Sequence, residues 1–118
     1  RYLLQDHETM FQVASDVLEN VRTGAQRAEI LDCVLAECVY VLTTFYNVPR
    51  GETADRLQGI LLYKGISNEN REILINALNL YKKQNLDIVD CLVHQTAKDN
   101  DMTVLSFDRD VNRKLPDA

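Results

Sequence analysis

The chain has 118 residues, 46% of them hydrophobic and 26% charged, which suits one domain over residues 1–118 with a single core and leaves no room for a second. Its net charge of -5 argues against a protein that coats nucleic acid through a broad basic face, because neutralising phosphates needs clustered Lys and Arg. No apolar run reaches the length of a membrane span, and three cysteines without paired spacing indicate reduced core thiols and a cytoplasmic location.

The first predicted element is an amphipathic helix from Glu8 to Val21. Apolar residues recur there at intervals of three and four, and Gly24 follows as a stop. The stretch EILDCVLA at residues 29–36 is short and apolar and contains branched residues, which favours a buried strand, although periodicity alone does not separate such a run from helix. The segment ECVYVLTTFY at residues 37–46 is predicted to be helical.

Two more helices are predicted in the middle of the chain. Helical spacing resumes over residues 51–65, with Gly65 as a stop. Ser67 or Asn68 is expected to cap the following helix over residues 71–85. The apolar side chains of that helix recur on one face, so we expect this face to point into the core.

The last predicted elements are a helix and a strand. Residues 87–98 have helical spacing with Asp87 as a cap, and MTVLSF at residues 102–107 reads as a strand. Strands that are apolar on both faces belong in a parallel sheet covered by helices, so the predicted fold class is α/β, a three-layer α/β/α sandwich with a short parallel sheet. Ligands of such sheets bind beyond the carboxyl ends of the strands, which is where Asp108 falls.

Three acids in this pattern are candidate metal ligands. Glu37 and Asp90 interrupt apolar runs, and a carboxylate there is costly to bury unless it is paired or binds a cation. With Asp108 they come from three separate elements, as the carboxylate ligands of Mg²⁺ often do. Each acid taken alone is more often a cap or an ion-pair partner, but three at one sheet edge favour a divalent ion.

Four segments occur in the order and spacing of a known family: RYLLQD, LAECVYVLTTFY, IVDCLVHQTAKDN and VLSFDRDVNRKL. They resemble, in turn, the segment after the first strand, the central Glu helix, the Asp-Ala-Leu helix and the Thr-Phe-Asp strand end of the PIN domain. The resemblance covers nearly the whole chain. It extends more narrowly to the small VapC-type toxin ribonucleases of bacterial and archaeal toxin–antitoxin pairs.

The resemblance implies a site and a reaction. By it, Glu37, Asp90 and Asp108 match the family's metal-binding acids. Asp110 matches a position that sometimes assists, and Ser106 keeps the hydroxyl of the family's usual Thr. If the Asp that ends the family's first strand is also present in the full-length protein, one or two Mg²⁺ or Mn²⁺ ions would activate water to hydrolyse an RNA phosphodiester bond, with no side-chain nucleophile. A homodimer and a cognate antitoxin that covers the active-site groove are also implied.

The sequence departs from the family at its start. The family's first strand ends in an Asp, a principal metal ligand, followed by Thr or Ser and then Asn, whereas this sequence begins at Arg1, just after that position. Because Arg1 is not a methionine, we expect the start to be a truncation or processing point. Without that strand, we expect the sheet to lose its central member and the metal its best-placed ligand.

Two other functions stay open. One is a catalytically inactive PIN-like module for binding or dimerisation, and the other, weaker, is a phosphatase-like or receiver-like α/β domain. His94, one turn after Asp90, is expected to pack against a neighbouring helix rather than to join the site. Tyr40, Phe45 and Tyr46 are interpreted as core or dimer-interface residues.

Overall fold

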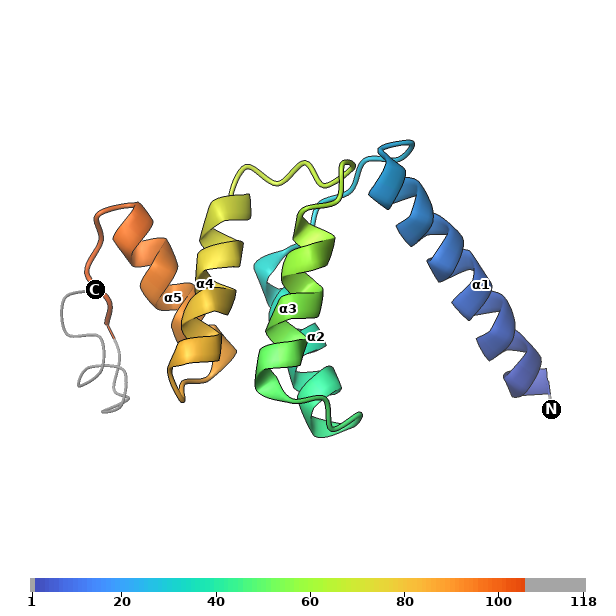
Figure 1. Ribbon diagram of the computed structural model, residues 1–118, viewed down its shortest axis with the longest axis horizontal. Coiled ribbons are helices and arrows are strands. Elements are labelled where there is room, and N and C mark those ends of the chain that lie inside the picture. The colour runs from blue at the N-terminus through green and yellow to red at the C-terminus, as the bar shows by residue number, and fades with distance from the viewer. Residues whose placement is uncertain (1, 106–118) are drawn as a thin grey trace.

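The structure is a computed structural model that describes residues 2–105, and the side chains of residues 9, 10 and 12–105. In chain order its helices are α1 (Tyr2–Thr23), α2 (Asp32–Thr44), α3 (Arg50–Leu61), α4 (Arg71–Lys83) and α5 (Ile88–Asp99). Helices α2 to α5 pack together, whereas α1 runs away from them (Figure 1).

The predicted α/β/α sandwich with a parallel sheet is wrong for the described residues. Between residues 2 and 105 the structure has helices and no strand or sheet, and one parallel bridge pairs Ala28 with Ile66. The predicted strand at residues 29–36 enters α2 at Asp32. Residues 102–105 of the other predicted strand belong to no strand, and residues 106 and 107 lie outside the described part.

The reason is that a strand needs neighbours and a helix does not. A lone extended segment leaves its N–H and C=O groups unpaired, whereas a helix satisfies most of them within itself. A short apolar run such as CVLAECVYVL contains Leu, Ala and Glu, which are good helix formers, so its pattern fits both states. With a single bridge available among the described residues, this run continues as helix.

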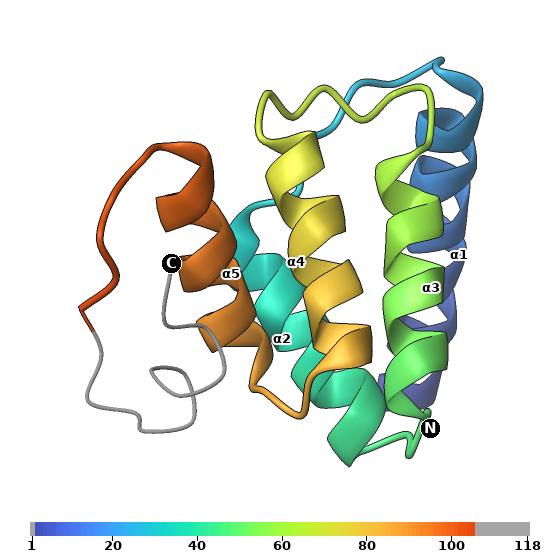
Figure 2. The same cartoon turned by 60° about the vertical axis from the view of Figure 1, so that its left-hand side comes forward.

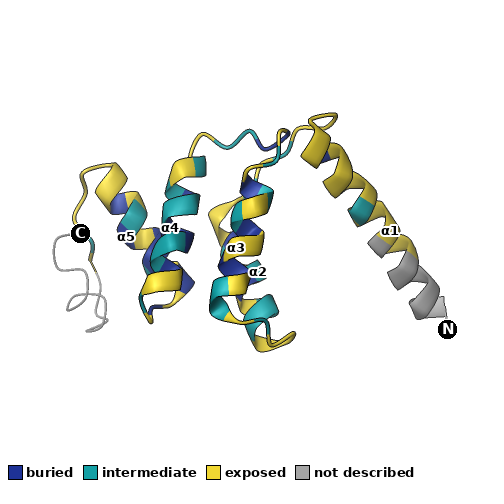
Figure 3. Ribbon diagram, viewed as in Figure 1, coloured by how far each residue is buried: buried dark blue, intermediate teal, exposed yellow. Residues whose placement is uncertain are grey.

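The helix predictions at residues 51–65, 71–85 and 87–98 are confirmed by α3, α4 and α5, with ends displaced by a few residues. Residues 37–46 are predicted to be helical, and α2 includes them as far as Thr44. The predicted apolar face of α4 is also confirmed, because Leu74, Ala77, Leu78 and Tyr81 are buried. These side chains meet others from α2, α3 and α5 to form the core, which Figure 3 shows as the dark interior of the bundle.

Asn68 does not cap α4 as predicted. The N-cap position belongs to Asn70, and no side chain forms a cap hydrogen bond there. Instead the Asn68 amide pairs with the backbone of Ile30: its Oδ1 accepts from the Ile30 N–H at 2.8 Å, and its Nδ2 donates to the Ile30 carbonyl at 2.7 Å. Asn68 therefore extends the pairing begun at Ala28 and Ile66 and anchors the segment that leads into α2.

Helix α1 includes the predicted amphipathic helix and ends at Thr23, before Gly24, whose φ of 88° is in the region that favours glycine. Its apolar side chains nevertheless stay in contact with solvent. Val21 is buried, but Met10, Val13, Val17 and Leu18 are 38–68% exposed. Figure 3 shows the described part of α1 mostly in the colour of exposed residues. None of the helices among residues 2–105 is both long enough and apolar enough to cross a membrane.

The aromatic residues at the end of α2 are not core residues. Tyr40, Phe45 and Tyr46 are 60–71% exposed, and the rings of Tyr40 and Phe45 meet edge to face with centroids 6.3 Å apart. The interpretation as core residues is therefore wrong. Their assignment to a dimer interface stays a prediction.

Candidate functional site

Two of the four predicted site acids, Glu37 and Asp90, lie in the described part of the chain. Glu37 is on α2 and exposed, and Asp90 is in the first turn of α5 and half-buried. Helices α2 and α5 contact each other, and Figure 2 shows them side by side. Asp108 and Asp110 lie outside the described residues, as does Ser106.

The first turn of α5 is held against the core on both sides of Asp90. Ile88 and Cys91 are 3% and 0% exposed, so the backbone that carries the carboxylate is anchored from within. Asp87 occupies the N-cap position, as predicted, but its side chain makes no cap hydrogen bond. The backbone on either side of Asp90 is therefore fixed to the core, while Asp90 itself is half-buried.

The three cysteines are free, and they differ in burial: Cys91 is buried, Cys38 half-buried and Cys33 exposed. The prediction of core thiols is therefore wrong for Cys33. Burial raises the pKa of Cys91 to about 12, so its thiol stays protonated near neutral pH. Cys91 is therefore not available as a thiolate nucleophile near neutral pH.

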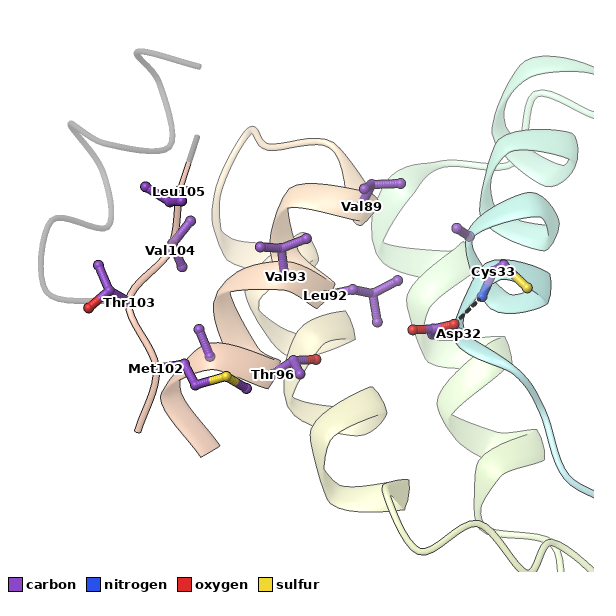
Figure 4. A pocket seen from close by; sticks show the side chains of 12 residues that line it. Asp32, Cys33, Val89, Leu92, Val93, Thr96, Met102, Thr103, Val104 and Leu105 are labelled. Atoms are coloured by element: carbon purple, nitrogen blue, oxygen red, sulfur yellow. Dashed lines mark hydrogen bonds between the residues drawn. The ribbon is translucent and has the colours of Figure 1, made fainter. Parts of the chain in front are cut away.

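A cavity of about 480 Å³ lies between the start of α2, one face of α5 and residues 102–105. Figure 4 shows Leu92 and Val93 on one side and Val104 on the other. Because its lining is mostly apolar, this cavity is not a metal site by itself.

Asp32 is the carboxylate that lines this cavity, and the sequence analysis did not select it. Its Oδ1 accepts a hydrogen bond from the Cys33 N–H at 2.7 Å. An acid in the first turn of a helix is a recognised start signal, but the signal was hidden while residues 29–36 were predicted to be a strand.

The described residues do not complete a metal site. Among residues 2–105, no group of three or more His, Cys, Asp or Glu side chains stands close enough to hold an ion. Glu37 and Asp90 supply the oxygen donors that Mg²⁺ prefers, from two helices in contact. The set of four acids therefore stays a prediction, and two of its members, Glu37 and Asp90, have donor groups that suit Mg²⁺.

His94 is buried in α5 at 8% exposure, as predicted for a histidine that packs against neighbouring helices. Its Nδ1 is buried and has no hydrogen-bond partner among the described residues. Burial lowers the pKa of His94, and the positive charge of Lys98 lowers it further. The imidazole is therefore neutral in the folded protein at neutral pH.

This depressed pKa predicts a loss of stability in mild acid. The unfolded chain takes up the His94 proton near the ordinary pKa of about 6.5, before the folded chain does, so protonation favours unfolding. The stabilising effect is present above pH of about 6.5 and is lost as the pH falls through the lower pKa of the folded state. Urea unfolding at pH 7.5 and pH 5.5 measures it, and His94→Leu should lose less stability between the two values than the wild type. Equal pH dependence in His94→Leu and the wild type would contradict the prediction.

The sequence model of the PIN domain family matches residues 2–114 of this chain. The match covers most of the chain and includes all four predicted acids. No curated protein and no solved structure matches the chain.

Proposed function

Because the chain belongs to the PIN domain family, we propose that it is a metal-dependent endoribonuclease and the toxin of a toxin–antitoxin pair. PIN domains are generally nucleases that use divalent metals. The observation that carries the proposal is the family match over residues 2–114, a range that contains all four acids.

In this proposal Glu37, Asp90 and Asp108 are the metal ligands, and Asp110 assists them. Bound Mg²⁺ or Mn²⁺ supplies the activation of water and the stabilisation of the leaving oxygen in phosphodiester hydrolysis. The carboxylates hold the ion and have no need to act as nucleophiles. The protonated thiol of Cys91 and the buried imidazole of His94 are consistent with this division of roles.

The proposed partners are RNA, a cognate antitoxin protein and a second copy of the chain, in the cytoplasm. With a net charge of -5, the protein has to contact RNA locally, and a bound divalent ion makes an acidic site attractive to phosphate. The exposed aromatic side chains Tyr40, Phe45 and Tyr46 support a protein interface, because aromatic residues are enriched in such surfaces.

Metal removal tests the proposed reaction. Full-length protein is incubated with structured RNA in chelator, then with Mn²⁺ or Mg²⁺ added back. We expect no cleavage in chelator and cleavage after either ion is restored, because the activated water depends on the ion. Products are resolved on a denaturing gel.

A doubly substituted protein, Glu37→Gln with Asp108→Asn, is purified in parallel to detect contaminating nucleases. Cleavage by this variant, or cleavage that persists in chelator, would remove the metal-dependent mechanism. A folded wild type that binds RNA or antitoxin and cleaves nothing with either ion would favour the inactive binding module instead.

A further inference from the structure

The side chain of Arg50 links the start of α3 to the connection between α4 and α5. Its Nη2 donates to three backbone carbonyl oxygens, those of Tyr81 at 2.8 Å, Gln84 at 2.9 Å and Leu86 at 2.5 Å. The guanidinium carbon lies 3.6 Å from the centre of the Tyr81 ring. Arg50 is therefore held through the face of its guanidinium group as well as through its N–H groups.

The three carbonyls belong to a segment in which regular helix bonding stops. Tyr81 is in the last turn of α4, where carbonyls have no intrahelical donor, and Gln84 and Leu86 are in the connection itself. In the connection Leu86 is 3% exposed, whereas Asn85 and Asp87 on either side of it are exposed, so this short segment is only partly buried. Where this segment is buried, unpaired carbonyls would be costly, and the Nη2 group of Arg50, with its two hydrogens, lies within hydrogen-bond distance of three of them.

Asp90 follows this connection within less than one helical turn. It lies two residues after Ile88, and the turn is closed by the Cys91 N–H, which donates to the Asp87 carbonyl at 3.1 Å. A displacement of the connection would therefore move Asp90 with it.

We propose that Arg50 is a positioning residue that fixes the first turn of α5, and with it Asp90, by binding three carbonyls of the α4–α5 connection. A role of Asp90 in catalysis depends on the proposed nuclease function, whereas the fixing of α5 by Arg50 depends only on the contacts.

Arg50→Lys is the decisive substitution. Lysine keeps the positive charge but presents a compact ammonium group, which cannot reproduce the stacked, planar guanidinium of Arg50 over Tyr81. Amide hydrogen exchange of the full-length protein is measured for residues 88–92. We expect exchange there to rise about tenfold or more, because the turn loses much of its support. Exchange in α2 should stay near the wild-type rate.

Two control variants separate positioning from general loss of stability. Arg56→Lys changes an arginine of the same helix whose exposed ion pair with Glu52 has an N–O distance of 3.0 Å. It should leave the exchange of α5 unchanged. Leu57→Ala removes a buried side chain of α3 that is 6% exposed, and it should lower global stability without a selective effect on residues 88–92.

The second readout is the Mn²⁺ concentration that gives half-maximal RNA cleavage. It should rise on the order of tenfold in Arg50→Lys, as for residues that orient metal ligands, and should stay near the wild-type value in Leu57→Ala. If Arg50→Lys does not purify in folded form, Arg50→Gln serves in its place, with the same expectations for both readouts.

Unchanged exchange at residues 88–92 in the substituted protein would overturn the inference. An equal rise in the half-maximal Mn²⁺ concentration in Leu57→Ala would also overturn it, because Arg50 would then act only through the stability of the fold. Failure of the wild type to cleave RNA would refute the proposed function instead, while the exchange experiment would still decide whether Arg50 fixes α5.

Discussion

Replacement of Asp90 by asparagine is expected to lower metal-dependent RNA cleavage by at least about 100-fold, which corresponds to about 2.7 kcal/mol of transition-state stabilisation. Asparagine keeps the size and shape of the side chain and removes its charge, so it withdraws the anionic donor that a divalent ion prefers. The anchoring of this turn by Ile88 and Cys91 should keep the backbone in place. The loss should therefore appear in the rate rather than in the fold.

The measurement is the cleavage rate at saturating Mn²⁺, together with the free energy of unfolding in urea. Asp99→Asn is the matched control, because it removes the same charge from the exposed far end of α5. We expect it to cleave at the wild-type rate. Equal rates for Asp90→Asn and the wild type would exclude Asp90 from the site, and a large loss of folding stability in Asp90→Asn would assign it a structural role.

Gly65→Ala is expected to lower the free energy of unfolding by about 3–5 kcal/mol. A Cβ at this position would lie 2.1 Å from the Gln26 carbonyl oxygen and 2.7 Å from that of Val21, both backbone atoms. The backbone would have to move, at a cost of about 1–3 kcal/mol. That movement also weakens two hydrogen bonds worth about 1 kcal/mol each, from the Gly65 N–H to Val21 and from the Ala28 N–H to Gly65.

Urea unfolding measures this loss, and Gly59→Ala provides the control. Gly59 lies in α3, is exposed and has no atom within 4 Å of a new Cβ. Alanine there should stabilise the protein by about 0.5–1 kcal/mol, because glycine is unfavourable inside a helix. A loss of less than about 1 kcal/mol in Gly65→Ala would show that the contact between α1 and the loop before α4 relaxes without cost.

The helical part of the fold is readable from local sequence. In α4, apolar residues at intervals of three and four predicted the face on which Leu74, Leu78 and Tyr81 are buried. That pattern is local, because each helix satisfies its own backbone hydrogen bonds. The exact caps were less predictable: Asn68 was expected to cap a helix and instead pairs with Ile30, a partner that lies far away in the sequence.

Membership in the PIN family also comes from sequence, because a sequence model of the family matches residues 2–114. The assignment of Glu37, Asp90 and Asp108 as metal ligands stays a proposal. The pairing state of residues 29–36 and the exposure of Tyr40 do not follow from the local sequence. They depend on which segments meet in space, and the structure pairs Ala28 with Ile66 and continues the rest of the run as helix.

The sequence by itself determined the helices α3, α4 and α5, the apolar face of α4 and the family to which the chain belongs. Only the tertiary structure decided that the described apolar runs form no sheet, that Asn68 and Arg50 bind distant backbone groups, and that α2 lies against α5. The physical reason is the range of the interactions. Helix periodicity is set by neighbours within four residues. Strand pairing and hydrogen bonds from side chains to distant backbone groups require partners that the local sequence does not specify.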